Sequence, residues 1–223
     1  MTTSATDANA FPCGASISIP GPAGLLEAIA TCPAGDAAPA TVVICHPHPV
    51  HGGTMNNKVV TTLVRAFGEL GLRTLRFNFR GVGASAGEYA QGVGETEDVL
   101  AVLSWVRERR PTDEIWLAGF SFGGYVALRA AAQFPLARLI AVAPAVHLYD
   151  ELGPPPAPGV PLLVLQGEAD EVVPFADVKK WIAGLESKPT VRLFPGVGHF
   201  FHGHLNDLRA AVHEELRASV PRE

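Results

Sequence analysis

The chain has 223 residues, and its 17 Lys and Arg against 22 Asp and Glu give a formal net charge of −5. With 48% hydrophobic and 17% charged residues, the composition is typical of a folded globular protein and excludes a disordered chain. A nucleic-acid-binding protein would need a concentrated basic face, whereas the first basic residue here is Lys58 and the later ones are scattered beside acids.

A chain of this length can bury one large core. We therefore expect a flexible N-terminal leader over residues 1–15, followed by a single domain over residues 16–223. The first ten residues lack the basic and apolar regions of a signal peptide, and no apolar run approaches the roughly 18 residues that cross a membrane. These features favour a cytoplasmic protein, monomeric or homodimeric, with no nucleic-acid or membrane partner.

The predicted elements begin with a hairpin, because residues 16–19 and 25–32 resemble strands around the turn sequence Pro-Gly-Pro. Continuous apolar runs, typical of strands covered on both faces, then alternate with helical periodicity. The expected order is strand 41–45, helix 57–70, strand 73–78, helix 95–109, strand 114–118, helix 122–134, strand 139–142, strand 161–166, helix 175–185, strand 190–194 and helix 205–219. This alternation predicts an α/β protein with a mostly parallel sheet and helices on both faces.

The three cysteines, Cys13, Cys32 and Cys45, are too few and too irregularly spaced to predict a disulfide framework. The sequence favours buried or unreactive thiols for all three. Cys45 precedes His46, but adjacent residues of a strand point to opposite faces, so the two side chains are not expected to act together.

Two serines lie in Gly-x-Ser-x-Gly motifs, Ser85 and Ser121. A nucleophilic serine needs a sharp turn between a strand and a helix, so that its hydroxyl projects and the helix N-terminus lies beneath the developing oxyanion. Ser121 directly follows a predicted strand and precedes a predicted helix. Ser85 lies within a glycine-rich loop, as expected of a mobile turn residue. The sequence therefore predicts Ser121 as the nucleophile.

A serine hydroxyl becomes reactive when a neutral imidazole takes its proton and a carboxylate orients that imidazole. Asp170 follows the strand predicted at 161–166, and His199 follows the strand predicted at 190–194. Because the carboxyl ends of parallel strands share one edge of a sheet, both side chains are expected near Ser121. The chain order Ser, Asp, His is that of α/β-hydrolases. The competing residues at these two positions are Glu168, Glu171, His202 and His204.

Two backbone N–H groups are expected to bind the oxyanion. Phe122, the residue after the nucleophile, supplies one. The second should come from the loop after strand 41–45, which reads His-Pro-His-Pro. Its prolines have no N–H, so His48 is the expected donor, with Gly52 and Gly53 as alternatives.

Six motifs carry a resemblance to a known family: HPHP at 46–49, GGTMNNK at 52–58, RFNFRGVG at 76–83, GFSFG at 119–123, GEADE at 167–171 and HFFH at 199–202. From about Ile17 onward the chain resembles the small cap-less bacterial α/β-hydrolases known as predicted hydrolases or esterases. The resemblance implies an α/β-hydrolase fold without a large cap domain. It also implies the same triad and the same oxyanion donors, but it supplies no substrate.

Three alternatives follow from other patterns. The HxHxxH sequence at 46–51 could hold zinc in a metal hydrolase. However, its gap contains Val50 rather than the Asp of binuclear hydrolases, and its prolines stiffen the segment, so we expect no metal. Residues 81–83, Gly-Val-Gly, do not complete a dinucleotide motif. A non-catalytic binding protein is the third alternative, and the complete Ser, Asp, His order argues against it.

The sequence thus predicts a carboxylesterase-type serine hydrolase that needs no cofactor and cleaves small esters with short acyl or aryl groups through an acyl-enzyme. Phe120 and Phe200 are expected to line the substrate site. The 18 residues between Val142 and Pro161 are mostly Pro, Ala and Gly, so any lid should be small. A thioesterase or a serine peptidase would use the same triad and stays an alternative.

Overall fold

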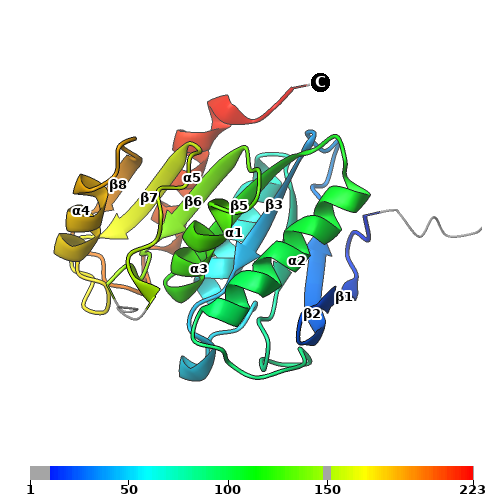
Figure 1. Ribbon diagram of the computed structural model, residues 1–223. Coiled ribbons are helices and arrows are strands. Elements are labelled where there is room, and N and C mark those ends of the chain that lie inside the picture. Colours follow the sequence, from blue (N-terminus) through cyan, green and yellow to red (C-terminus); the bar gives the residue numbers. More distant parts are fainter. Residues whose placement is uncertain (1–10, 148–151, 223) are drawn as a thin grey trace, which may run out of the picture.

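The computed structural model describes residues 11–147 and 152–222, and the strands of this part of the chain form one sheet of eight (Figure 1). The strands are β1 (Ser16–Gly21), β2 (Gly24–Thr31), β3 (Ala40–Cys45), β4 (Arg73–Phe77), β5 (Glu114–Phe120), β6 (Arg138–Val142), β7 (Leu162–Gly167) and β8 (Thr190–Phe194). The helices are α1 (Lys58–Glu69), α2 (Val93–Arg109), α3 (Phe122–Ala131), α4 (Phe175–Ala183) and α5 (Leu205–Leu216), with short 3-10 helices η1 (Pro49–His51) and η3 (Arg217–Ser219).

The sheet is mostly parallel, as predicted, and its order is β1-β2-β4-β3-β5-β6-β7-β8. Strands β3 to β8 run parallel to one another, whereas β1 and β2 form the predicted hairpin and join the sheet by antiparallel pairing of β2 with β4. All residues of β3 and β7, and all but the first of β5, are buried. This burial on both faces explains the continuous apolar runs of these strands.

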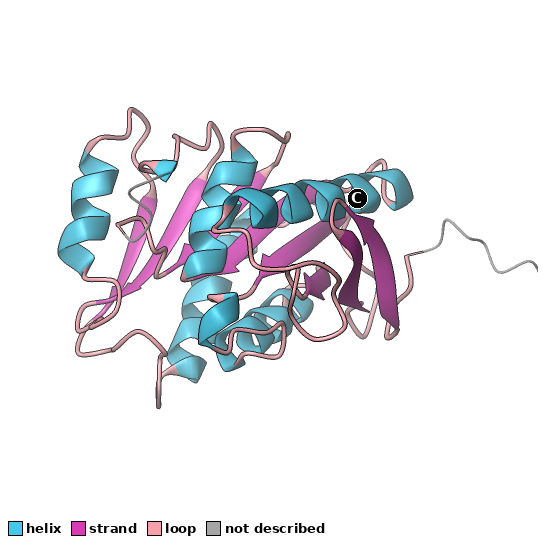
Figure 2. Ribbon diagram, turned by 60° about the horizontal axis from the view of Figure 1, so that its bottom comes forward, coloured by secondary structure: helices cyan, strands magenta, loops and turns pink. Residues whose placement is uncertain are grey.

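Helices cover both faces of the sheet (Figure 2). One apolar core lies beneath α2, α3 and α4, and a second lies beneath α1 and α5. The sheet therefore forms the middle of three layers, and the carboxyl ends of its parallel strands meet at one edge.

Some boundaries differ from those predicted. Helix α3 ends at Ala131 rather than at Phe134, because Pro135 follows and the residue before a proline disfavours helical backbone. Strand β5 continues to Phe120, because its last two residues pair with the end of β6. The last helix ends at Leu216, and the 3-10 helix η3 replaces its predicted final turn.

The prediction of unbonded thiols is wrong for two of the three cysteines, because Cys13 and Cys32 form a disulfide. The β1–β2 register pairs Ser16 with Ile29, so the hairpin brings the residue three positions before β1's start opposite the residue just after β2. Spacing rules for disulfide frameworks do not detect such a lone pair. Cys45 is a free, buried thiol, as predicted.

Residues 11–15, the described part of the predicted flexible leader over residues 1–15, contact the rest of the protein. Gly14 donates its N–H to the carbonyl oxygen of Ala30 at 2.9 Å, and the ring of Phe11 packs against that of Trp105 in α2 with 6.3 Å between centroids. Residues 11–15 are therefore attached to the sheet. Residues 1–10 of the predicted leader lie outside the described residues.

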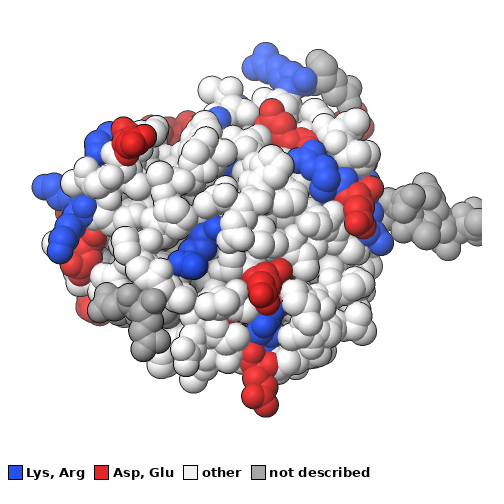
Figure 3. Space-filling view, viewed as in Figure 1, with Lys and Arg blue, Asp and Glu red and all other residues white. Residues whose placement is uncertain are grey.

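The surface charge, the helices and the β6–β7 connection test three expectations from the sequence, which concern nucleic acid, membranes and a cap domain. On the face shown in Figure 3, basic and acidic side chains are scattered and form no continuous basic patch. Within residues 11–147 and 152–222, no helix is long and apolar enough to span a membrane. The described parts of the connection between β6 and β7 contain no α-helix, in keeping with the expected absence of a large cap.

Candidate active site

Ser121 occupies the turn between β5 and α3 with φ of 56° and ψ of −118°. Such a positive φ costs a residue with a Cβ about 1–3 kcal/mol and persists only where the surrounding structure holds it. Here the Ser121 N–H donates to the carbonyl oxygen of Val142 at 2.9 Å, and the Ser121 carbonyl accepts the N–H of Tyr125 at 3.1 Å. These contacts fix the hydroxyl at the N-terminus of α3, where the helix dipole favours negative charge.

The two glycines of this motif are required by close backbone contacts. A Cβ on Gly119 would collide with the backbone of Gly123, and a Cβ on Gly123 would collide with the carbonyl groups of Cys45 and His46 at the end of β3. Because neither glycine has a side chain, α3 can approach the ends of β3 and β5 closely enough to form the turn.

A chain of hydrogen bonds joins the predicted nucleophile, base and acid. Nε2 of His199 lies 2.9 Å from Oγ of Ser121, and Nδ1 of His199 lies 2.9 Å from Oδ2 of Asp170. The carboxylate only accepts, so Nδ1 carries the proton, and Nε2 is left to accept from the serine hydroxyl. All three side chains are buried, with His199 2% exposed. The structure thus brings together side chains that are 78 and 29 residues apart in the sequence.

Both carboxylate oxygens of Asp170 accept hydrogen bonds from neighbouring residues. Oδ1 accepts the N–H groups of Val172 at 3.0 Å and Val173 at 2.7 Å, and Oδ2 accepts from the side-chain amide of Gln166 at 3.0 Å. Sequence reasoning did not single out Gln166. The signal that could have found it is a lone polar residue at the end of the otherwise apolar run Leu-Leu-Val-Leu-Gln in β7.

The competing residues have other positions. Glu168 is exposed, and Oε2 of Glu171 lies 3.3 Å from the backbone nitrogen of His199, whose N–H it accepts, rather than against the imidazole. The ring of His202 lies 5.8 Å from that of Phe200, and His204 pairs with Asp207 at 2.8 Å. None of these contacts reaches the hydroxyl of the predicted nucleophile.

The expectation that Phe120 lines the substrate site is wrong. Phe120 is fully buried, its ring lies 4.9 Å from the imidazole of His199, and it is not among the residues that line the cavity. Phe200 lines the cavity beside Ser121 and is 43% exposed. The alternation of side chains along β5 explains the difference, because Phe120 points with Ala118 into the core beneath α1 and α5.

A cavity of about 480 Å³ opens above the serine. Its apolar lining includes Phe122, Ala145, Val172 and Phe200. The loop after β3 and the start of α1 contribute Pro47, His48, His51, Gly52, Gly53 and Asn57. Among the described residues that line it, none is Asp, Glu, Lys or Arg. The cavity is therefore suited to an uncharged molecule of modest size.

The expected oxyanion donors Phe122 and His48 both line this cavity beside Ser121, and their rings lie 5.1 Å apart. The alternative donors are already engaged, because the N–H of Gly52 donates to Pro49 and that of Gly53 donates to the carbonyl of His48. Nδ1 of His48 accepts the N–H of Val50, so its Nε2 carries the proton and donates to the hydroxyl of Tyr89 at 3.1 Å. Burial, with a smaller effect of the charge on His51, lowers the pKa of His48 to about 4.

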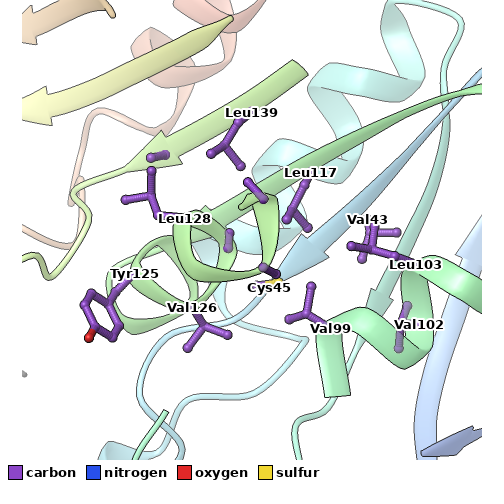
Figure 4. Packing of buried hydrophobic residues seen from close by; sticks show 14 of the residues in the cluster. Val43, Cys45, Val99, Val102, Leu103, Leu117, Tyr125, Val126, Leu128 and Leu139 are labelled. Carbon is purple, nitrogen blue, oxygen red and sulfur yellow. The ribbon is translucent and has the colours of Figure 1, made fainter. Parts of the chain in front are cut away.

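The HxHxxH segment does not form a metal site. Nδ1 of His46 bonds to the carbonyl of Pro47 at 2.6 Å, and its Nε2 accepts the N–H of Phe79 at 3.0 Å, so both ring nitrogens are used. Within the described residues, no group of three or more His, Cys, Asp or Glu side chains is placed to hold a metal ion. The thiol of Cys45, on the opposite face of the strand, lies in the apolar core (Figure 4).

Acidification is expected to destabilise the fold through His46. Burial lowers the pKa of its imidazole from 6.5 to about 4, so the unfolded state binds an additional proton between these values. The free energy of unfolding should therefore fall as the pH drops from 6.5 towards 4, by up to about 3 kcal/mol from this group. Urea denaturation at a series of pH values measures the slope, which should be shallower in His46→Gln. A His46→Gln protein with the native slope would contradict the assignment.

The prediction that Ser85 is a mobile turn residue is wrong, because this serine is buried and hydrogen-bonded. Ser85 lies away from the candidate site. Its side chain is buried, donates to the carbonyl of Asn78 at 2.7 Å and accepts the N–H of Glu27 at 2.9 Å. Ser85 therefore links its loop to β2. The sequence could not show this, because the partner strand lies 58 residues away.

The fold and the site together define a class of protein. A mostly parallel sheet with helices on both faces, a serine on a sharp strand-to-helix turn, and an aspartate and a histidine after later strands are the defining features of α/β-hydrolases.

Comparison with known proteins agrees with this class. Residues 49–159 match the family model of the alpha/beta hydrolase fold. An alpha-beta serine hydrolase homologue from Coxiella burnetii is 49% identical, with a TM-score of 0.88 over 92% of this chain and 98% of that one. A member of the a/b serine hydrolases without lid, from Xanthomonas campestris, is 45% identical, with a TM-score of 0.89 over 96% of this chain and 99% of that one.

Uncharacterized protein RP471 of Rickettsia prowazekii is 35% identical over 208 residues, which cover 88% of this chain and 86% of that protein. The chain belongs to the α/β-hydrolase fold family.

Proposed function

We propose that this protein is a carboxylesterase-type serine hydrolase that cleaves small, uncharged esters through an acyl-enzyme. The observation that carries the proposal is the hydrogen-bond chain from Ser121 through His199 to Asp170, with 2.9 Å at each step. This arrangement supplies the nucleophile, the general base and the orienting carboxylate that acyl transfer requires.

The first half of the reaction forms the acyl-enzyme. Nε2 of His199 takes the hydroxyl proton of Ser121 as Oγ attacks the ester carbonyl carbon. Asp170 keeps the imidazole in the Nδ1–H tautomer and stabilises its positive charge. The tetrahedral intermediate collapses, His199 gives the proton to the leaving alkoxide, and the alcohol departs.

The second half repeats these steps with water. His199 takes a proton from a water molecule that attacks the acyl carbon, and Ser121 leaves with that proton. In both halves the negative oxygen is bound by the backbone N–H groups of Phe122 and His48. The position of both residues in the cavity wall beside Ser121 supports this role.

The substrate class is argued from the cavity. No charged side chain is among its described lining residues, which favours a neutral ester over an anionic or cationic one. Its volume of about 480 Å³ and its apolar wall fit an aryl or short acyl group. With p-nitrophenyl esters, acetate or butyrate should therefore be hydrolysed faster than octanoate, and the opposite order would contradict this substrate class.

The mechanism is tested by labelling with a fluorophosphonate and locating the adduct by mass spectrometry. We expect modification at Ser121, its disappearance in Ser121→Ala, and a sharp decrease in His199→Ala. The matched control is Ser85→Ala, which alters the other Gly-x-Ser-x-Gly motif and should keep the native labelling. A native protein that is folded but unlabelled, or labelled at another residue, would contradict the proposal.

Matched ester, thioester and amide substrates of the same acyl group separate an esterase from a thioesterase or a serine peptidase, which use the same triad. We expect kcat/KM to be highest for the ester. A higher value for either of the other two would replace the esterase proposal by that alternative while leaving the triad in place.

We also propose that the protein acts in the cytoplasm on a small-molecule ester, as a monomer or homodimer, without a nucleic-acid, membrane or metal partner. The scattered charge on the face shown in Figure 3 supports the absence of nucleic acid. The Cys13–Cys32 disulfide is unusual for a reducing compartment. Alkylation of the protein in intact cells tests the location. If the protein is cytoplasmic, the reducing environment should open this disulfide and both cysteines should be labelled, whereas protected cysteines would favour an oxidising compartment.

A further inference from the structure

The last residue but one of strand β7, Gln166, is polar and fully buried among apolar neighbours. Burying an amide is unfavourable unless hydrogen bonds replace its contacts with water. Its partners therefore indicate why an amide, rather than another apolar side chain, occupies this position.

The nitrogen of the Gln166 amide has three acceptors around it. Nε2 lies 3.0 Å from Oδ2 of Asp170, 3.0 Å from the carbonyl oxygen of Val173 and 3.3 Å from that of Gly167. All three partners accept only, which fixes the orientation of the amide with its N–H groups towards the carboxylate. Oδ2 is also the oxygen that accepts Nδ1–H of His199.

The oxygen of the same amide is buried and has no hydrogen-bond partner among the described residues. A buried acceptor without a partner destabilises the fold, which offsets part of what the donor side of the amide contributes by its contacts with the two carbonyl groups. The third acceptor is the carboxylate of the proposed triad, so the amide also acts directly on Asp170.

We propose that Gln166 is a positioning residue, which fixes the orientation and charge of Asp170 so that His199 keeps the tautomer and the basicity needed to activate Ser121. This inference rests on the proposed serine hydrolase mechanism. Oδ1 of the carboxylate is tied to the backbone N–H groups of Val172 and Val173, and Gln166 fixes the other oxygen. Without it, Oδ2 would be held by the imidazole alone.

The amide also withdraws negative charge from the carboxylate, as any donor to an anion does. Removing it should make Asp170 a stronger partner for a protonated imidazole and so make His199 easier to protonate. Among the described residues, the other ionisable groups near this histidine are Glu171, whose carboxylate accepts its backbone N–H, and His48 and His51, which line the same cavity. All three are unchanged by substitution of Gln166. A change in the pH dependence of the rate therefore reports on the contact between Gln166 and Asp170.

The first test is Gln166→Met, which keeps the length of the side chain and removes the donor. With p-nitrophenyl acetate, kcat should fall about tenfold, the effect of one hydrogen bond to a charged group, while KM stays within about twofold. The acid limb of the kcat/KM profile should move to higher pH. The rate of fluorophosphonate labelling at Ser121 should fall in parallel. The control is Val164→Ala, a buried residue on the same face of β7, which should lower the melting temperature but leave the pH profile in place.

The second test is Gln166→Glu, which is nearly isosteric and does not depend on the first variant folding. At low pH its protonated carboxyl can still donate to Asp170, and at higher pH it becomes a second carboxylate at the same place. The activity relative to the native protein should therefore decline as the pH rises. A ratio that does not change with pH, or a folded Gln166→Met protein with native kcat and a native acid limb, overturns the inference. Failure of the proposed function is distinguishable, because the native protein itself would then show neither esterase activity nor labelling at Ser121.

Discussion

Replacing Asp170 by asparagine is expected to lower kcat for ester hydrolysis about 10⁴-fold, without unfolding the protein. An asparagine amide can donate to Nδ1 of His199, which moves the imidazole proton to Nε2. The base then faces Ser121 with a donor instead of an acceptor and cannot take the hydroxyl proton. Steady-state hydrolysis of p-nitrophenyl acetate measures kcat, and circular dichroism verifies the fold.

The control for this prediction is Glu168→Gln, which removes a neighbouring carboxylate that is exposed. Its kcat should stay within about twofold of the native value, the range expected of a surface substitution. If Glu168→Gln lost activity and Asp170→Asn kept it, Asp170 would not be the orienting acid. Equal, large losses in both would point to the loop as a whole rather than to one carboxylate.

The second large effect is on stability, because Gly123→Ala should lower the free energy of unfolding by about 3 kcal/mol or prevent folding. The added methyl group would overlap the carbonyl groups of Cys45 and His46, which are backbone atoms at the end of a central strand. Neither the strand nor the start of α3 can move away without breaking sheet pairing or the turn at Ser121. Urea denaturation measures the change, and expression as insoluble protein is the extreme outcome.

The matched control is Gly68→Ala in α1, where an added Cβ would meet no atom within 4 Å. Alanine has the higher helix propensity, so this variant should gain about 0.5–1 kcal/mol. The same substitution in two helices thus has opposite expected signs. A Gly123→Ala protein as stable as Gly68→Ala would show that the close approach of α3 to β3 is not required.

Much of the fold follows from local patterns. The apolar runs of β3, β5 and β7 identify strands covered on both faces, and their alternation with helical periodicity identifies the parallel sheet. The choice of Ser121 over Ser85 also needed only local context, since one serine lies between a strand and a helix and the other within a loop. These features depend on residues that are neighbours in the sequence.

Other features depend on which distant segments meet. The Cys13–Cys32 bond requires the register of the hairpin, and the burial of Ser85 requires a strand 58 residues away. Alternation along β5 places Phe120 on the same face as Ala118, but only the packing of the second core decides that Phe120 contacts the imidazole of His199.

The sequence by itself therefore determined the order of the elements, the turn that carries Ser121 and the short segments that contain Asp170 and His199. Only the tertiary structure decided which carboxylate of the Gly-Glu-Ala-Asp-Glu segment reaches the imidazole, because Asp170 and Glu171 are adjacent and equally acidic. The backbone N–H groups of Val172 and Val173 turn Asp170 inward, while Glu171 is directed to the backbone of His199. Periodicity records which side chains are buried, but hydrogen bonds to the backbone of a folded loop decide which atoms face one another.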